Sequence, residues 1–375
     1  MTVSSIDLYR FRNIKDQHIE FSPGVTLLTG DNAQGKTNAL EAVYYFAAGK
    51  SFRGVKDREA VMKEEESSRL ALRFTEEADG EARERKLELG LFTGKRKEMK
   101  RSGIAIAHAS EFIGCFRAVL FCPEHLQLVK GGPQGRRAFL DTAVCQLKPA
   151  YLSALSVYAK LLKQKNALLK NDVMDFRQKK ELLEVLNEQL AGPDAYITAV
   201  RRDYIKRICV KAGKVIEEMT QGKESLSISY VSDICEAGSG AEEEELRQRY
   251  REKQKKREER ELYAGMTLGG CHRDDIAITL DGEEAKTYAS QGQDRSIALA
   301  MKLAEGEIAK ERSGEAPVFL FDDVLSELDS SRQEYLMERT QGKQVILTSC
   351  GGESVGATAG VRKIRVREGT FEVIN

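Results

Sequence analysis

Residues 30–37 read GDNAQGKT, and this octapeptide decides the fold because it matches the pattern G-x-x-x-x-G-K-[ST]. The run at residues 25–29 before it is short and rich in β-branched residues, which predicts a strand. Residues 36–48 after it place apolar side chains at helical spacing. A strand, a glycine-rich turn and a helix in this order predict a phosphate-binding loop. The alternative is a chance glycine turn, which leaves both flanking elements unexplained.

Each part of this loop has a predicted role in holding ATP. Backbone N–H groups and the positive end of the helix wrap phosphate oxygens, and the glycines permit the tight turn. Lys36 is predicted to place its charge on the β- and γ-phosphates, and Thr37 to offer its hydroxyl to Mg²⁺. The residues predicted to bind the nucleotide here are Gly30, Asp31, Asn32, Ala33, Gln34, Gly35, Lys36 and Thr37.

An acidic pair follows a buried strand later in the chain. Residues 318–321 are wholly apolar and lead into Asp322 and Asp323. Asp322 is predicted to hold Mg²⁺ through water, and Asp323 to orient or deprotonate the water that attacks the γ-phosphate. Alone, such a pair would be an ordinary turn at a strand end. Together with the phosphate-binding loop it predicts a catalytic site.

A third motif, YASQGQ at residues 288–293, precedes that strand and opens a helix. It resembles the signature motif of ABC-type ATPases, with Ser290, Gly292 and Gln293 in the matching places. A serine hydroxyl and a glycine backbone at a helix N-terminus form a second receptor for the γ-phosphate. The alternative is a plain serine helix cap. Because the motif precedes Asp322-Asp323, the signature interpretation is favoured. The predicted catalytic residues are then Lys36, Asp323, Ser290 and Gln293. Contact with the nucleotide is also predicted for Ser290 and Gly292.

The predicted elements divide the chain into two lobes. Strands and helices alternate in residues 1–123 and 263–375, which favours a mostly parallel sheet. Residues 124–262 are dominated by helical spacing. The predicted fold class is therefore α/β, with one lobe made from both ends of the chain and a helical second lobe inserted between them. The resemblance of residues 288–293 to the ABC signature motif implies that the first lobe is an ABC-type P-loop ATPase head.

Several local features carry narrower expectations. Apolar runs at 70–74 and 87–91 are predicted to pair as antiparallel strands. Residues 225–231 resemble an isolated strand, and residues 276–280 a strand of the α/β sheet. The pair Gly192-Pro193 is predicted to interrupt the helices of the second lobe.

Composition limits the function classes. The 375 residues hold 59 Lys and Arg against 59 Asp and Glu, so bulk charge does not hold this chain on DNA. No apolar run approaches the length of a membrane span, and charged residues within the first 20 positions exclude a signal-peptide core. The seven cysteines form no C-x-x-C pair, which disfavours zinc. The sequence predicts a cytoplasmic protein without a membrane partner.

Further segments carry a resemblance to one family. Residues 6–13 resemble the opening strand of Rad50 and SMC heads, in which the positions matching Arg12 and Asn13 reach the nucleotide phosphates. Residues 123–131, residues 136–141 and the stretch GCHRDD at 270–275 resemble segments of the RecF family, with Cys271 where proline is usual. The resemblance covers nearly the whole chain.

The resemblance implies more than the composition does. It implies an ABC-type ATPase that dimerises on ATP, binds single-stranded or gapped DNA, and helps to load recombinase in DNA repair and replication. Mediator proteins such as RecR are implied as partners. Residues 326–329 match the loop that lines the dimer interface, and Thr348-Ser349 stands where many ABC ATPases have a switch histidine. Asp323 is shorter than the usual glutamate, so slow, DNA-dependent turnover is expected.

Some assignments stay open at this point. A nucleotide-binding transporter subunit and a non-hydrolysing, ATP-bound scaffold are the alternative functions. Glu124 and Gln127 are both candidates for the sensor of the Gln-loop, and His272 and Arg273 are equally consistent with functional and structural roles.

The basic clusters that could contact DNA are also unresolved. A solvated surface is favoured for each of them, and a solvated helix is favoured over a nucleic-acid arm for the charge-rich residues 241–262. The clusters are Lys95-Arg96-Lys97 with Lys100-Arg101, Arg136-Arg137, Arg201-Arg202 and Lys255-Lys256-Arg257.

Overall fold

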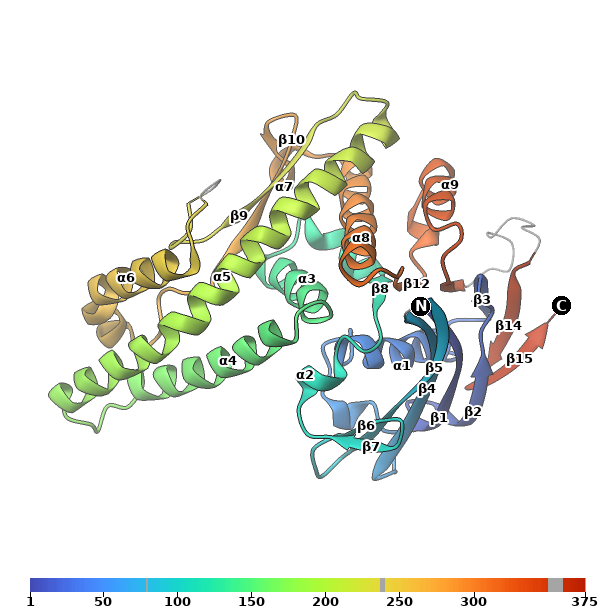
Figure 1. The fold of residues 1–375 in the computed structure, drawn as a ribbon, viewed down its shortest axis with the longest axis horizontal. Coiled ribbons are helices and arrows are strands. Elements are labelled where there is room, and N and C mark those ends of the chain that lie inside the picture. The colour runs from blue at the N-terminus through green and yellow to red at the C-terminus, as the bar shows by residue number, and fades with distance from the viewer. Residues whose placement is uncertain (79, 237–239, 350–359, 375) are drawn as a thin grey trace. The chain divides into compact units, whose positions relative to one another are not determined.

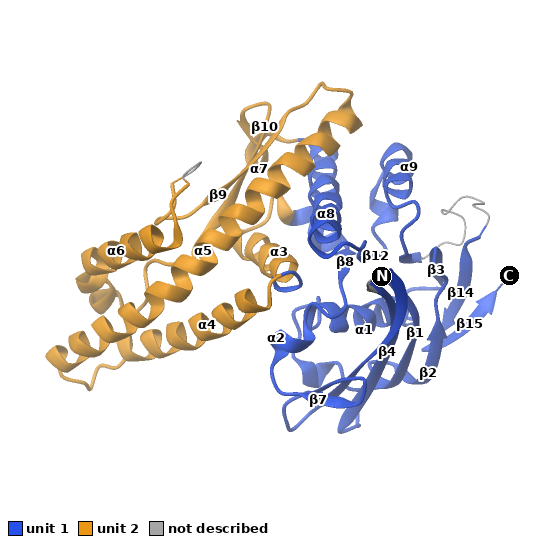
Figure 2. Cartoon of the chain, viewed as in Figure 1, with its two compact units in different colours: residues 1–127, 145–147, 290–375 blue, residues 128–144, 148–289 orange. Residues whose placement is uncertain are grey.

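The chain forms two compact units in the computed structural model, which describes residues 1–78, 80–236, 240–349 and 360–374 (Figure 2). Unit 1 comprises residues 1–127, 145–147 and 290–375. Unit 2 comprises residues 128–144 and 148–289. Both ends of the chain therefore build unit 1, and its middle builds unit 2.

Unit 1 holds a six-stranded, mostly parallel sheet that carries the predicted phosphate-binding loop (Figure 1). Its order is β15-β14-β3-β13-β12-β8, and every neighbouring pair is parallel except β14 with β15. This confirms the predicted α/β class. The carboxyl ends of β3, β13 and β12 meet at one edge of the sheet, where such folds bind ligands. The strands are β3 (Val25–Thr29), β8 (Ala118–Phe121), β12 (Val318–Asp322), β13 (Val345–Ser349), β14 (Arg362–Arg367) and β15 (Thr370–Ile374).

A second six-stranded sheet of unit 1 is antiparallel, in the order β2-β1-β4-β5-β6-β7. Leu70 of β4 lies opposite Leu89 of β5, which confirms the predicted pairing. Ile6 and Leu8 alternate along β1, are buried, and share one core with Leu40 of the helix that follows the phosphate-binding loop. The strands are β1 (Thr2–Phe11), β2 (Ile14–Glu20), β4 (Ser67–Ala78), β5 (Glu81–Phe92), β6 (Glu98–Arg101) and β7 (Ile104–Ile106).

The helices of unit 1 follow the predicted spacing closely. Helix α1 contacts strands of both sheets and is almost wholly buried, because it fills the space that their apolar faces enclose. The helices are α1 (Lys36–Ala48), α2 (Ala109–Phe112), α8 (Gln291–Ser313) and α9 (Ser330–Arg339). Three 3₁₀ turns are η1 (Asp57–Glu59), η2 (Pro123–Leu128) and η3 (Leu325–Glu327).

Unit 2 is built mainly from helices, and the predicted interruption at Gly192-Pro193 is wrong. Pro193 lies inside α5, which runs unbroken for 45 residues. Helices α4 and α6 and strand β9 all pack on α5, and that burial outweighs the cost of one lost hydrogen bond. The helices are α3 (Pro133–Cys145), α4 (Pro149–Leu169), α5 (Phe176–Thr220), α6 (Glu243–Ala264) and α7 (Ala285–Tyr288). Among the described residues, no helix is both long and apolar enough to span a bilayer.

The strand β9 (Leu226–Val231) is not isolated, contrary to expectation. It pairs antiparallel with β10 (Asp275–Leu280), which in turn pairs with the short β11 (Glu283–Glu284). Residues 276–280 therefore join a small sheet in unit 2 rather than the α/β sheet. For the same reason residues 263–289, which the predicted division assigned to the ATPase lobe, lie in unit 2. Periodicity alone could not reveal which strand β10 would pair with.

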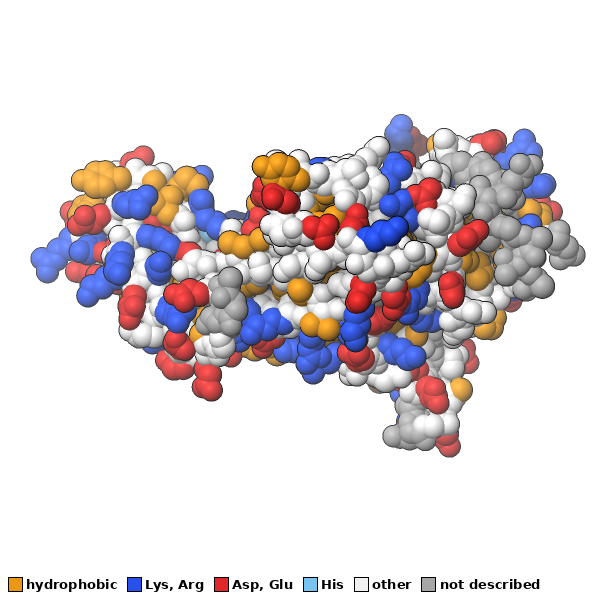
Figure 3. Space-filling view, turned by 90° about the horizontal axis from the view of Figure 1, so that it is seen from above, with side chains coloured by type: hydrophobic (Ala, Val, Ile, Leu, Met, Phe, Trp, Pro, Cys, Tyr) orange, Lys and Arg blue, Asp and Glu red, His pale blue; other side chains and the backbone are white. Residues whose placement is uncertain are grey.

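The charge-rich helix α6 has one buried side and one exposed side. Leu246, Tyr250 and Gln254 recur at i,i+4 and are buried on the side that contacts α5. On the exposed side Arg249 bonds Glu245 at 2.6 Å, an i,i+4 pair of the predicted kind. Lys, Arg, Asp and Glu side chains are likewise interspersed over the face shown in Figure 3. Both signs of charge therefore mix on this surface.

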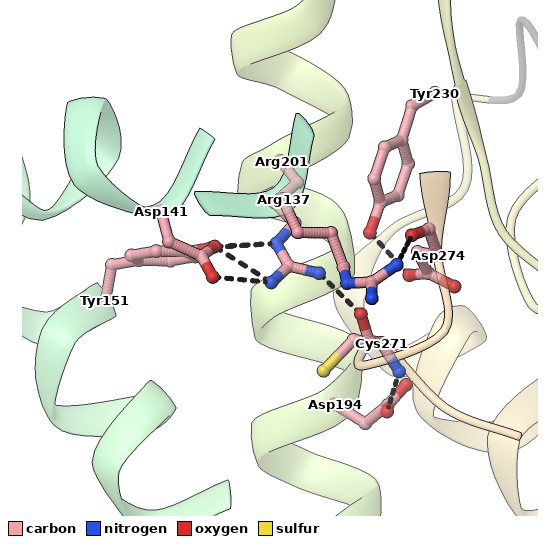
Figure 4. Close-up of polar contacts among 8 residues, drawn as sticks. All are labelled: Arg137, Asp141, Tyr151, Asp194, Arg201, Tyr230, Cys271 and Asp274. Atoms are coloured by element: carbon pink, nitrogen blue, oxygen red, sulfur yellow. Dashed lines mark hydrogen bonds and ion pairs between the residues drawn. The ribbon is translucent and has the colours of Figure 1, made fainter. Parts of the chain in front are cut away.

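Two of the predicted basic clusters contain a buried arginine. Arg201 is only 2 % exposed, donates to both carboxylate oxygens of Asp141 at 2.8 and 3.0 Å, and donates to the carbonyl of Cys271 at 2.6 Å (Figure 4). Arg136 makes a two-pronged ion pair with Asp275 at 2.7 and 2.8 Å. These two guanidinium groups are held inside unit 2, so neither the solvated-surface reading nor a DNA contact applies to them.

The GCHRDD stretch makes its contacts inside the same polar network. His272 shares a hydrogen bond of 2.7 Å with Tyr158, and Arg273 donates to the carbonyl of Thr267 at 2.8 Å. Burial and nearby cations lower the pKa of His272 to about 4. These contacts favour the structural alternative for both residues.

Buried carboxyl groups in this network make the stability of unit 2 depend on pH. Asp194 accepts a hydrogen bond from the Cys271 N–H at 2.7 Å, and Asp274 accepts one from the Tyr230 hydroxyl (Figure 4). Burial raises the pKa of Asp194 to about 6 and the pKa of Asp274 to about 7. A raised carboxyl pKa means that the folded chain binds protons more tightly than the unfolded chain. The stabilisation is therefore present at about pH 4 and is lost as pH rises towards 7.

We expect Asp194→Asn to remove part of this pH dependence, because an amide does not ionise while its oxygen can still accept from Cys271. The gain in the free energy of unfolding of the variant over the parent should be larger at pH 8 than at pH 5 by about 1 kcal/mol, because about one pH unit of the titration of Asp194 lies above pH 5. Urea unfolding at both pH values measures this. Asp172→Asn, on the exposed α4–α5 loop, is the control for loss of one formal charge. An Asp194→Asn effect that is equal at the two pH values would contradict the burial argument.

Candidate nucleotide-binding site

The phosphate-binding loop needs glycine at two positions because other chain segments approach its backbone. Gly30 has φ of 150°, and a Cβ there would lie 2.3 Å from the Val366 carbonyl oxygen. Gly35 has φ of 119°, and a Cβ there would lie 3.0 Å from Oδ1 of Asn13. At Gly30 a side chain would collide with backbone, and at Gly35 it would be strained by the positive φ and would press on the Asn13 side chain. The two glycines of the motif are therefore required for steric reasons in this fold.

Lys36 is buried at the start of α1 and closes the loop upon itself. Its Nζ donates to the carbonyl oxygens of Gly30 and Asp31 at 2.5 and 2.8 Å. The ammonium group therefore lies at the centre of the loop. A cavity of about 350 Å³ opens in front of it. The cavity is lined by Asn13, Asn32, Ala33, Gln34, Gly35, Lys36, Thr37, Asn38, Arg53, Asp323 and Thr348.

A hydrogen-bond network joins the loop to the ends of β12 and β13. The hydroxyls of Thr37 and Thr348 donate to the same oxygen of Asp322, at 2.8 and 2.9 Å. The hydroxyl of Thr348 also accepts from the Asp323 N–H at 2.9 Å. Burial raises the pKa of Asp322, and the two hydroxyl hydrogen bonds oppose that rise. The structure therefore brings together four residues that lie up to 311 positions apart in the chain.

The backbone of Asp323 adopts a conformation that is uncommon for a residue with a side chain. Its φ is 51°, in the left-handed region, where Asp and Asn are the least disfavoured of such residues. Strained backbone of this kind concentrates at functional sites. At Asp323 the turn places the residue in the cavity wall immediately after Asp322.

The residues present suit Mg²⁺. Thr37 and Asp322 place a hydroxyl and a carboxylate oxygen within 2.8 Å of each other beside the cavity, and Mg²⁺ prefers such hard oxygen ligands. Within the described residues, no group of three or more His, Cys, Asp or Glu side chains could hold a metal on its own. The donor set therefore fits a Mg²⁺ that also takes ligands from a bound nucleotide and water.

The structure differs from the prediction at Arg12. Its guanidinium donates to both oxygens of Glu41 at 2.6 and 3.0 Å and to the Glu59 carbonyl at 2.7 Å, and it does not line the cavity. The Glu41 side chain is fully buried and needs a cationic partner, which explains the contact. Asn13 does line the cavity. Arg53 lines it as well, and sequence reasoning missed this residue because the segment after α1 matches no motif.

The signature motif forms the exposed start of α8. The side chain of Ser290 accepts from the Gln293 N–H at 3.3 Å, and the Gln293 side chain accepts from the Ser290 N–H at 2.8 Å. The helix-cap alternative is thus realised, and it leaves the exposed Ser290 outside the lining of the cavity. Arg332 of α9 donates to the Gly292 carbonyl at 3.0 Å and to the Ser296 hydroxyl at 2.8 Å. These bonds fix the motif to the segment after β12.

Comparison with known proteins places this geometry in a family. The family model for the RecF/RecN/SMC N-terminal domain matches residues 2–371. The DNA replication and repair protein RecF of Shouchella clausii is 37 % identical over 381 residues, covering 99 % of each chain. The protein of the same name from an Exiguobacterium species is 40 % identical over 351 residues, covering 93 % of this chain and 92 % of its own. The chain belongs to the RecF family.

Solved structures agree with this membership. The structure of the recombination mediator protein RecF with ATP superposes on the RecF-family chain with a TM-score of 0.90, at 33 % identity, and covers 100 % of this chain and 98 % of its own. The Smc head of Pyrococcus furiosus matches with a TM-score of 0.54 at 17 % identity, which shows a shared fold alone. Both predictions, of the family and of an ABC-type ATPase head, are confirmed.

Two candidates for the Gln-loop sensor of this RecF-family chain stay unassigned. Glu124 and Gln127 lie in η2 with exposed side chains, and neither lines the cavity. Thr348, in the place of the switch histidine, does line it and bonds Asp322. The described contacts therefore give Thr348 a place beside the predicted catalytic pair.

Proposed function

We propose that this RecF-family chain binds ATP with Mg²⁺ at residues 30–37 and uses it to join two copies into a homodimer that holds DNA during repair and replication. The observation that carries the proposal is the convergence on one cavity of Lys36 and Thr37, at the start of α1, with Asp323, directly after β12. The name of the matched ATP-bound RecF structure supports ATP as the nucleotide. The names of the curated relatives support work in DNA replication and repair.

The residues divide the chemistry between them. Lys36 and the N–H groups of the loop neutralise the β- and γ-phosphates, and Asn13 and Arg53 border the same cavity. Asp323 orients the attacking water and accepts its proton. Thr37 and Asp322 would hold Mg²⁺, which supplies charge neutralisation of the phosphate oxygens when bound.

Ser290 completes the site of the second copy. Its position outside its own cavity, at an exposed helix N-terminus, supports a contact with the γ-phosphate held by the other copy. ATP is then part of the interface, so dimerisation depends on it, and hydrolysis releases it. Because Asp323 is shorter than a glutamate, we expect slow turnover, accelerated when DNA favours the dimer.

DNA and protein partners follow from the same proposal. Mixed surface charge favours sequence-independent contacts to phosphates of single-stranded or gapped DNA over a strong general field. A mediator such as RecR is the proposed protein partner, since the matched structures describe RecF in the RecFOR pathway. The deciding measurement is the ATPase rate and oligomeric state with and without gapped DNA. A transporter subunit or a non-hydrolysing scaffold would show no DNA-stimulated turnover.

We expect Ser290→Arg to bind ATP as a monomer and to fail to dimerise, because a bulky cation would occupy the place of the other copy's γ-phosphate. Analytical ultracentrifugation with ATP should show dimers in the parent and about tenfold fewer in the variant, a loss near 1.4 kcal/mol. The ATP-dependent retention of gapped DNA by the protein should be lost with the dimer.

Ser156→Arg, at an exposed serine of α4, is the matched control and should dimerise like the parent. Nucleotide binding by both variants, measured by a fluorescent ATP analogue, checks that unit 1 is folded. Normal ATP-dependent dimers in Ser290→Arg would exclude the two-copy site while leaving the phosphate-binding loop intact.

A further inference from the structure

The phosphate-binding loop contacts a chain segment that lies more than 330 residues away in sequence. Strand β14 runs parallel to β3, with Arg365 opposite Thr29, the last residue before the loop. β14 then continues alongside the loop, since the Val366 carbonyl lies where a Cβ of Gly30 would be. The turn that ends β14 therefore reaches the far side of the loop.

This turn is a tight hairpin of two residues. Arg367 pairs with Thr370, so Glu368 and Gly369 alone connect β14 to β15. Both have positive φ, 49° and 76°, as a type I′ turn requires. The two consecutive N–H groups of this turn point away from the hairpin ladder and are available to a third segment.

Gln34 of the phosphate-binding loop accepts from both N–H groups. Its carbonyl oxygen accepts from Gly369 at 2.8 Å, and its side-chain Oε1 accepts from Glu368 at 2.7 Å. Asn13 adds a third bond, from its Nδ2 to the same carbonyl at 3.1 Å. The pattern G-x-x-x-x-G-K-[ST] does not require glutamine at this position. The bond from the Glu368 N–H to Oε1 therefore gives the Gln34 side chain a role in contacting the turn.

The fit leaves no room for a side chain at the second position of the turn. A Cβ on Gly369 would lie 2.4 Å from the carbonyl oxygen of Asn13, in the turn between β1 and β2. Asn13 in turn accepts from the Asn38 side chain at 2.7 Å, at the start of α1. The phosphate-binding loop is thus held between two turns, one from each end of the chain.

We propose that the Glu368-Gly369 turn is a positioning element of the ATP site, and that Gln34 is the residue through which it acts. By fixing the carbonyl and side chain of Gln34, the turn holds the loop in its phosphate-binding shape before nucleotide arrives. A preformed loop loses less conformational freedom on binding, which strengthens ATP affinity. The loop contacts ATP equally in the ground state and in the transition state. Loss of the positioning should therefore raise KM for ATP and leave kcat nearly unchanged. This proposal rests on the proposed ATP-binding function.

Two variants test the proposal from opposite sides. Gln34→Met keeps the size of the side chain and removes its acceptor. Gly369→Ala introduces a methyl group against the Asn13 carbonyl. We expect ATP affinity to fall about threefold to tenfold in Gln34→Met and about tenfold or more in Gly369→Ala, with kcat at saturating ATP within about twofold of the parent.

A second hairpin turn supplies the control. Ser102 and Gly103 join β6 to β7 with φ of 48° and 82°, and a Cβ on Gly103 would meet no atom within 4 Å. Gly103→Ala therefore carries the same backbone strain without the contact to the loop. It should leave ATP affinity unchanged.

Hydrogen exchange of residues 30–37 in the nucleotide-free full chain separates this proposal from the ATP-binding proposal. Loop amides should exchange faster in Gln34→Met and Gly369→Ala than in the parent and in Gly103→Ala. Equal exchange in all four proteins, or unchanged ATP affinity in folded Gln34→Met, would overturn the positioning role. If Gly369→Ala does not fold, Gln34→Met alone decides. If the parent binds no ATP but the exchange differences appear, the turn still positions the loop and the ATP proposal fails.

Discussion

Lys36→Ala should lower ATP affinity by at least about a hundredfold and abolish turnover, because it removes the cation at the centre of the phosphate-binding loop. A hydrogen bond to a charged partner contributes about 1.5–3 kcal/mol, and Lys36 serves two phosphates in the proposed site. The buried Nζ, 2.5 Å from the Gly30 carbonyl, already lies inside the loop at the edge of the cavity. Isothermal titration with ATP and Mg²⁺ measures the loss.

Lys343→Ala is a matched control for this variant. Lys343 is a partly buried lysine of unit 1 that, like Lys36, donates to a backbone carbonyl, that of Arg339 at 2.6 Å, and it lies outside the cavity. It should bind ATP like the parent. Parent-like ATP affinity in a folded Lys36→Ala protein would remove the basis for placing the nucleotide at residues 30–37.

The sequence determined the ATPase head well, because its signals are local. A strand followed by GDNAQGKT and a helix allows one arrangement, and α1 begins at Lys36 as the motif requires. The capping box at Ser290 and Gln293 likewise marks the start of α8 in the sequence itself. Where residues a few positions apart determine the structure, the predicted and observed elements agree.

The errors lie where distant contacts decide. Pro193 stays inside α5 because three neighbouring elements pack on that helix, which no local rule contains. Arg12 forms an internal ion pair with Glu41, a buried carboxylate on α1 that also accepts from the Ser51 hydroxyl, and no local pattern in the sequence shows this pairing. Arg201 was counted with surface basic pairs, although Asp141, which pairs with it, lies 60 residues earlier. Burial of a charge depends on its partner, and sequence spacing does not identify the partner.

The residues around the cavity also divide into those that local motifs predicted and those that only the tertiary fold brings there. Thr37 and Asp322 were predicted from separate motifs, and their contact of 2.8 Å follows from parallel strands that end at one edge. Arg53 and the Glu368-Gly369 turn carry no motif, and both reach the loop only through the tertiary fold. The predictions therefore covered the chemistry of the site better than its supports.

Asp323→Asn should keep ATP binding and slow hydrolysis by about a hundredfold to ten-thousandfold, the usual contribution of a general base. Asparagine is close in size and tolerates the left-handed backbone at φ of 51° as well as aspartate does. Its backbone N–H can still donate to Thr348, so the network around Asp322 persists. The amide cannot accept the proton of the attacking water, and the proposed ATP-bound dimer should therefore accumulate.

Single-turnover hydrolysis of labelled ATP, together with sedimentation in ATP, tests both parts of this expectation for Asp323→Asn. Asp281→Asn is the control, because Asp281 also has a positive φ, 53°, and lies in unit 2 rather than at the cavity. It should hydrolyse ATP at the parent rate. If Asp323→Asn hydrolyses ATP at the parent rate, Asp323 is not the general base, and another group around the cavity must have that role. Slow hydrolysis without accumulated dimers would instead retain Asp323 as the base and reject ATP as the link between two copies.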